Sequence, residues 1–228
     1  MDSDADADAQ LKARLAGLFY LVTIGAGIFA QAGSRLAVLG DSDAATAANI
    51  AANTSLYRAG EAADLVMLCS YVVVTALLYE LFARTERTLS VIAAGFSLMG
   101  IAVLAANGGL HLAPLALLES GGLPTAQRDA LIGLSLTLHG ALYGVSLVFF
   151  GVYCVLLGVL TMRTRLAPRP VGVLLALGGL VHVLTRMGAV VSPEAVAQLP
   201  KLLNLAPLLG EASLALWLLL VGRRPTGA

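Results

Sequence analysis

Charge is the scarcest feature of this sequence. Only 12% of its 228 residues are Asp, Glu, Lys or Arg, whereas a soluble domain carries about 25%. Hydrophobic residues make up 58% of the chain, and the mean hydropathy is +0.87. This leaves too little polar surface to coat a water-soluble globule, and it excludes intrinsic disorder, which requires low hydrophobicity and high net charge. The 14 basic and 14 acidic residues cancel, so the composition predicts no nucleic-acid partner.

Other absences exclude several classes of protein. The two cysteines, Cys69 and Cys154, lie far apart inside apolar runs, so we expect neither a disulfide framework nor a CxxC redox pair. The sequence has no HExxH, GxSxG or P-loop motif, which excludes the enzymes that those motifs define. No lysine falls inside a predicted membrane span, which excludes a retinal Schiff base.

Six apolar segments are long enough to cross a bilayer. A spanning helix needs about 20 mostly apolar residues, and an open strand cannot satisfy its backbone hydrogen bonds in lipid. The alternating pattern of an outer-membrane barrel is absent. We therefore predict an all-α, polytopic transmembrane bundle of six helices. The predicted spans are residues 15–33, 57–82, 89–113, 130–160, 171–191 and 207–221.

The basic residues of the connections predict the orientation of the bundle. Nine of the 14 lie before span one, between spans two and three, between spans four and five, or after span six. The positive-inside rule places these segments, and both termini, in the cytoplasm. Residues 1–14 are then an acidic cytoplasmic tail, residues 15–222 the transmembrane domain and residues 223–228 a second cytoplasmic tail. An alternative interpretation of span one is a signal peptide cleaved near Ala30-Gln31-Ala32.

Polar residues are concentrated in the outer half of the predicted spans. Ionisable groups inside a membrane are costly, so they mark a functional site or an internal pairing. Residues three or four positions apart share one helix face, which predicts polar stripes that meet at the bundle axis. We expect a cavity that is open to the outside, closed toward the cytoplasm and able to bind a small polar ligand. Its candidate ligand-binding residues are Glu61, Asp64, Asn107, His139, Tyr143, His182, Arg186 and Glu211.

Three functions are compatible with these residues. The first is ligand binding or transport, which requires no cofactor. The second is a zinc-dependent intramembrane hydrolase, in which imidazole and carboxylate ligands hold zinc and an activated water; its metal ligands would be His139, Asp64 and Glu61. The third is a structural or accessory subunit, in which the buried charges only pair with one another.

Several local expectations follow from spacing. Arg58 lies one turn from Glu61 and Asp64 and predicts a helix-end ion pair. Glu211 is expected to lie between two basic groups, His182 and Arg186, whose spacing of four residues is otherwise unfavourable.

Glycine and proline predict two further features. His111 stands beside a Gly-Gly pair and is expected to be solvated, because residues 108–125 are predicted to break the helix. Span four carries a face of small residues that predicts close helix packing, and that face also offers a surface for a homo-oligomer. Its glycines are Gly133, Gly140, Gly144, Gly151 and Gly158.

Several segments together resemble one bacterial family. They are residues 14–20, 63–65, 139–151, 168–174 and 210–218. The chain is similar over nearly its whole length to the membrane proteins grouped as domain of unknown function 4386. The resemblance implies a multi-pass protein of the bacterial inner (plasma) membrane, with the lipid bilayer as its partner, and it implies no established activity.

Overall fold

The computed structural model describes residues 2–222, and it describes side chains for residues 6–200 and 202–222. Within this part of the chain, six helices are long and apolar enough to cross a membrane. The first consists of α1 (Asp2–Ile28), the π-helix η1 (Phe29–Arg35) and α2 (Leu36–Val38). The other five are α4 (Thr54–Ala83), α5 (Arg87–Glu119), α6 (Thr125–Thr164), α7 (Arg169–Val191) and α9 (Leu205–Leu220). The predicted all-α bundle of six transmembrane helices is confirmed.

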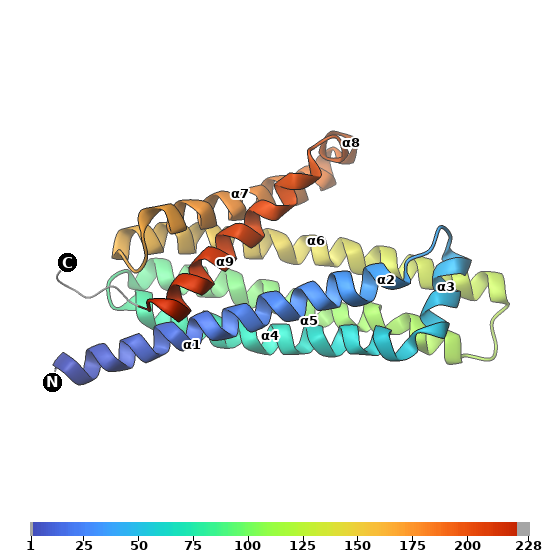
Figure 1. Cartoon of the computed structure of the whole chain (residues 1–228). Coiled ribbons are helices and arrows are strands. Elements are labelled where there is room, and N and C mark those ends of the chain that lie inside the picture. The colour runs from blue at the N-terminus through green and yellow to red at the C-terminus, as the bar shows by residue number, and fades with distance from the viewer. Residues whose placement is uncertain (1, 223–228) are drawn as a thin grey trace.

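Short helices lie in the connections at one end of the bundle. They are α3 (Asp43–Ala52), α8 (Pro193–Ala197) and the 3-10 helix η2 (Lys201–Asn204). We call this end the α3 end, and we call the opposite end, where the chain begins and ends, the terminal end (Figure 1). The predicted topology places the α3 end outside the cell.

Two helices extend beyond the predicted spans. Residues 2–14, predicted to be an acidic tail, continue α1 as a helix, and Lys12 joins this extension to α4 through an ion pair of 2.7 Å with Glu80. The expected break at residues 108–125 is wrong for most of its length, because α5 continues through Pro114 to Glu119. Packing against α4 and α6 on both sides holds this stretch helical although proline removes one backbone donor.

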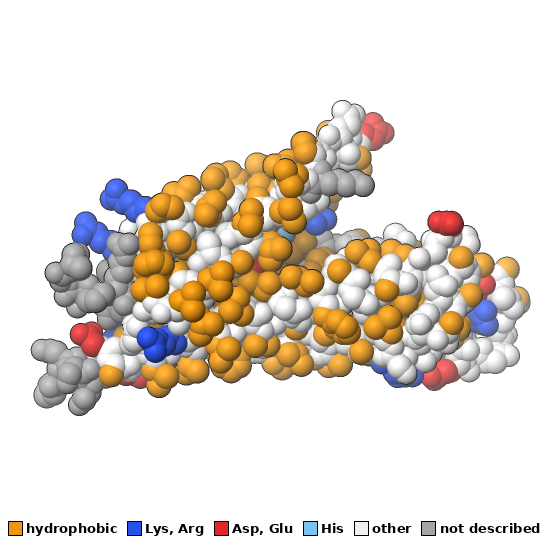
Figure 2. Space-filling view, in the orientation of Figure 1, with side chains coloured by type: hydrophobic (Ala, Val, Ile, Leu, Met, Phe, Trp, Pro, Cys, Tyr) orange, Lys and Arg blue, Asp and Glu red, His pale blue; other side chains and the backbone are white. Residues whose placement is uncertain are grey.

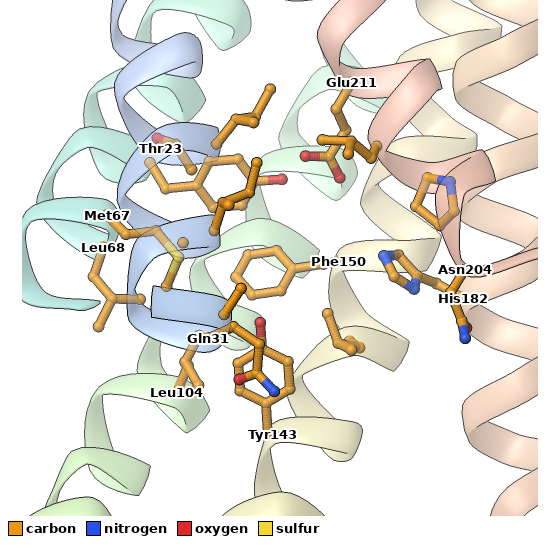
Figure 3. A pocket seen from close by; sticks show the side chains of 18 of the residues that line it. Thr23, Gln31, Met67, Leu68, Leu104, Tyr143, Phe150, His182, Asn204 and Glu211 are labelled. Atoms are coloured by element: carbon orange, nitrogen blue, oxygen red, sulfur yellow. The ribbon is translucent and has the colours of Figure 1, made fainter. Parts of the chain in front are cut away.

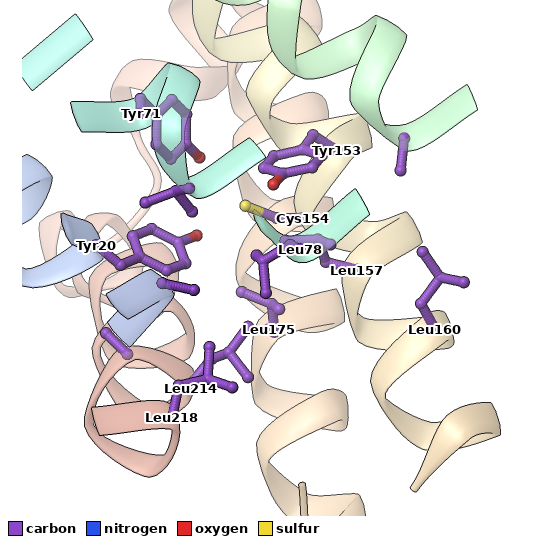
Figure 4. Close-up of a cluster of buried hydrophobic side chains, with 14 of the residues drawn as sticks. Tyr20, Tyr71, Leu78, Tyr153, Cys154, Leu157, Leu160, Leu175, Leu214 and Leu218 are labelled. Carbon is purple, nitrogen blue, oxygen red and sulfur yellow. The ribbon is translucent and has the colours of Figure 1, made fainter. Parts of the chain in front are cut away.

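The aromatic and aliphatic core occupies the terminal half of the bundle (Figure 4). Tyr71 of α4 is at its centre, with ring centroids 5.7 Å from Tyr20 of α1, 4.8 Å from Phe150 and 5.9 Å from Tyr153 of α6. Leucines of α4, α6, α7 and α9 fill the space around these rings. Toward the α3 end, α7 and α9 diverge from the other spans (Figure 1). The bundle is therefore closed in its terminal half and splayed beyond it.

Part of the glycine face of span four, at Gly151 and Gly158, is a packing surface for α7, whereas Gly133 lies against Asp43 of α3. A Cβ on Gly151 would lie 2.8 Å from the carbonyl oxygen of Gly179, and one on Gly158 would lie 2.5 Å from that of Gly172. Such distances leave no room for a side chain, so these glycines let the two backbones touch. A homo-oligomer through Gly151 and Gly158 would have to displace α7.

The α6–α7 seam predicts a position-specific effect of adding one methyl group. We expect Gly151→Ala to lower the free energy of unfolding by about 1–3 kcal/mol, because the methyl group overpacks the seam. Gly140→Ala, on the same helix and with nothing within 4 Å of its Cβ position, should leave stability unchanged or raise it by about 0.5–1 kcal/mol. Denaturant unfolding of both variants in mixed micelles measures the difference, and equal effects would contradict the packing role.

Candidate functional site

A cavity of about 400 Å³ lies where α7 and α9 leave the bundle. All six spans contribute to its wall, together with η2. The space-filling view shows a hollow in this region with acidic, histidine and basic side chains beside it (Figure 2). Its volume is within the range of small-molecule sites. Its polar and ionisable lining residues are Thr23, Gln31, Tyr71, Tyr143, His182, Arg186, Asn204 and Glu211.

Glu211 points into the cavity from α9 (Figure 3). The preceding Gly210 allows α9 to pack closely on α7, since a Cβ there would lie 2.8 Å from the carbonyl oxygen of Leu174. The thiol of Cys154 donates to Glu211 Oε1 at 3.4 Å. No ion pair involving Glu211 is found among the described side chains. A carboxylate in an apolar bundle is costly without a cation or a hydrogen-bond donor set.

His182 and Arg186 face the cavity from α7. The Nε atom of Arg186 is buried and has no hydrogen-bond partner in the described part of the protein. Its Cδ lies 3.9 Å from the position that a Cβ on Gly144 would take, so the side chain lies along α6 at that level. The predicted cluster is therefore present as a shared cavity, but no direct hydrogen bond or ion pair joins Glu211 to either residue within residues 6–200 and 202–222.

Gln31 and Tyr143 connect the cavity to a buried ion pair. Both residues line the cavity. The Gln31 Oε1 atom accepts a hydrogen bond of 3.0 Å from Arg35 Nε, and the Arg35 guanidinium lies 5.8 Å from the centre of the Tyr143 ring. Arg35 in turn binds Asp64 through both of its terminal nitrogens, with Nη2 and Oδ1 3.3 Å apart.

The Arg35–Asp64 pair corrects one expectation from the sequence. Arg58 pairs instead with Glu119 at 3.1 Å on the surface, so the predicted ion pair of Arg58 with Glu61 or Asp64 is wrong. Arg35 is not among the predicted site residues, because the predicted first span ends at residue 33. Its spacing of four residues from Gln31 is the signal that could have indicated it, since residues four apart share one helix face.

The pair depends on the π-helix. Residues 29–35 adopt the wider π geometry, which inserts an extra residue into the helix and often occurs at functional sites. Arg35 is the last residue of this segment, and its exposed fraction is only 7%. Span one therefore remains helical while its guanidinium is directed into the bundle.

A second polar layer lies beyond the ion pair, toward the α3 end. His111 is fully buried and stacks on Tyr57 with ring centroids 4.1 Å apart, so the prediction that it is solvated is wrong. The ring centroid of His139 lies 5.5 Å from that of His111, and Asn107 Nδ2 donates to the backbone oxygen of His139 at 3.0 Å. The carboxylate of Glu61 lies against Gly108 of α5. Five buried atoms of this layer have no partner among the described residues: Tyr57 Oη, Glu61 Oε2, Asn107 Oδ1, His111 Nδ1 and His139 Nε2.

The predicted ligand-binding residues thus fall into two groups. Tyr143, His182, Arg186 and Glu211 line the cavity. The other four lie outside the cavity wall: Asp64 is in the ion pair with Arg35, and Glu61, Asn107 and His139 are in the layer beyond it. Within the described residues, no three or more His, Cys, Asp and Glu side chains are placed to hold one metal ion. His139, Asp64 and Glu61 are therefore not gathered into a zinc site.

Comparison with known proteins places the chain in a family. A family model described as Domain of unknown function (DUF4386) matches residues 15–222. The chain belongs to this family. No curated protein and no solved structure matches it. Membership in DUF4386 agrees with an integral membrane protein of six spans, and the activity has to be inferred from the cavity.

The buried ion pair predicts unequal effects of two charge removals. Asp64→Asn leaves Arg35 as an uncompensated buried charge, so we expect a loss of about 3–5 kcal/mol in the free energy of unfolding. Glu119→Gln removes an exposed partner of Arg58 and should cost no more than about 1 kcal/mol. The double variant Arg35→Gln/Asp64→Asn should recover part of the first loss. Denaturant unfolding in mixed micelles tests all three, and a mild effect of Asp64→Asn would argue against the pair.

Proposed function

We propose that this member of DUF4386 is a multi-pass protein of the bacterial inner membrane that binds a small polar ligand in the cavity between its six spans. The observation that carries the proposal is the cavity itself, with Glu211 and Arg186 in its wall and neither charge neutralised by a partner among the described residues. A scaffold that buried charges only to pair them would join these two groups directly. Their separation supports recognition of a ligand.

The arrangement of the two halves supports access from the outside. The aromatic core around Tyr71 blocks the cavity on the terminal side. Toward the α3 end, α7 and α9 diverge and leave the hollow seen in Figure 2. With the predicted orientation, both termini in the cytoplasm, the hollow faces the outer side of the membrane.

A transport cycle is compatible with the contacts of α7. At the α6–α7 seam, glycines bring the two backbones into contact, and short side chains such as those of Ala176 and Cys154 pack beside them. Small movements of the α7–α9 pair over this smooth surface would change the width of the cavity. Alternating access in many transporters is such a movement of one group of helices against another.

Binding predicts a ligand-dependent thermal shift that requires the cavity acid. In a screen of polar metabolites on purified protein, we expect at least one compound to raise the melting temperature of the wild type. Glu211→Gln should abolish that shift, because it removes the only carboxylate that the described residues contribute to the cavity wall, while the ligand-free variant stays folded. Glu119→Gln, at an exposed surface pair, is the matched control and should keep the shift. Absence of any stabilising compound would favour a structural role.

Cysteine labelling tests the orientation of the cavity. In a Cys69→Ser background, which leaves only the buried Cys154, single cysteines at Ala44 of α3 and at Thr85 between α4 and α5 lie at opposite ends of the bundle. A membrane-impermeant maleimide added to intact cells should label the cysteine at position 44 and not the one at position 85. The reverse pattern would place the cavity mouth on the cytoplasmic side and contradict this part of the proposal.

A further inference from the structure

The charges of the cavity are separated along its length. Their levels can be compared along helix α6, because Glu211 contacts Cys154 and Arg186 lies beside Gly144. These two positions on α6 are ten residues apart, which corresponds to roughly 15 Å along a helix. The acid therefore marks the deep end of the cavity, and the guanidinium marks the other end, at the level of Gly144 and next to Tyr143 on α6. Figure 3 shows Glu211 at one end of the cavity, with Tyr143 and Gln31 at the other.

The wall between the two charges is mostly apolar. Leu147 and Phe150 of α6 line the cavity between the levels of Gly144 and Cys154. Met67 and Leu68 of α4 face them across it. His182 is the ionisable group on the wall at intermediate depth, one helical turn before Arg186 on α7. A ligand that fills this space needs an apolar middle section.

We infer that the cavity selects zwitterions, with an ammonium group bound by Glu211, a carboxylate bound by Arg186 and an alkyl or similarly apolar segment between them. This inference rests on the proposed ligand binding and names its substrate class. Two opposite charges held apart in a low-dielectric wall are each costly, and one molecule with the complementary charges neutralises both at once. A compound with a single charge neutralises only one of them.

The dimensions indicate the length of a suitable probe. Ion pairs at the two ends take up about 3 Å each, which leaves roughly 9 Å of the helical separation for the ligand itself. An unbranched amino acid with its two charges at opposite ends of an eight-carbon chain, 8-aminooctanoate, extends to roughly 10 Å between its nitrogen and its carboxylate carbon and can therefore reach both ends. Its shorter homologue 4-aminobutanoate cannot reach both ends.

The test compares four probes on the wild-type protein in lipid nanodiscs, with empty nanodiscs correcting for partition into lipid. The probes are 8-aminooctanoate, 4-aminobutanoate, octylamine and octanoate. We expect 8-aminooctanoate to bind at least tenfold more tightly than each of the others in isothermal titration calorimetry. Equal affinities for octylamine and 8-aminooctanoate, or for the two amino acids, would overturn the inference without requiring any variant to fold.

Two charge-removing variants separate the contributions of the ends. Glu211→Gln should lower the affinity for 8-aminooctanoate at least tenfold, so that this probe binds the variant no more tightly than octanoate does. Arg186→Gln should lower the affinity for 8-aminooctanoate equally, so that this probe binds the variant no more tightly than octylamine does. Circular dichroism and the melting temperature establish that each variant is folded, and Glu211→Asp should restore part of the affinity. A folded variant that keeps wild-type affinity contradicts the inference.

The outcomes distinguish this inference from the function on which it rests. If uncharged or singly charged metabolites stabilise the wild type and depend on Glu211, while 8-aminooctanoate does not bind, ligand binding stands and the zwitterion inference is wrong. If no probe and no metabolite binds, both are wrong.

Discussion

The buried ion pair between Arg35 and Asp64 is the interaction on which the polar half of this bundle depends. Both side chains are more than nine-tenths buried, so neither charge is compensated by water. Removing two ions from water costs several kcal/mol each unless the geometry is good and other hydrogen bonds are made. Here the guanidinium binds both carboxylate oxygens, and Gln31 accepts from its Nε atom. The pair therefore fixes span one against α4 at one register.

That fixed register determines where the cavity can form. Gln31 and Tyr143 contact Arg35 on one side and line the cavity on the other. A rotation of span one that broke the pair would also move Gln31 out of the wall. The π-helix allows span one to make two sets of contacts at once. Its extra residue lets the turn that holds Gln31 and Arg35 face inward, while α1 still packs on α9 through Gly17.

The sequence was sufficient to predict the number, class and approximate limits of the spans, because twenty-residue apolar runs leave a helix little alternative in lipid. It also indicated that Tyr143, His182, Arg186 and Glu211 share a cavity. It did not indicate Arg35, since a π-helix has no simple composition signal and the periodicity used was that of an α-helix. His111 was misassigned for a related reason: local Gly-Gly and proline signals favoured a break, whereas contacts with α4 and α6 keep α5 helical past it.

The two halves of the bundle differ in how their interiors are filled. The terminal half is closed by tyrosine and phenylalanine rings that pack around Tyr71 with centroids 4.8, 5.7 and 5.9 Å from its own. The other half holds most of the buried side-chain polar atoms that have no partner among the described residues, and such atoms favour ordered water. Opening the terminal half would require the rings around Tyr71 to separate. Tyr71 and Glu211 line the same cavity, and the thiol of Cys154, next to Tyr153 on α6, donates to the carboxylate. The cavity acid therefore lies at the boundary between the aromatic half and the polar half of the bundle.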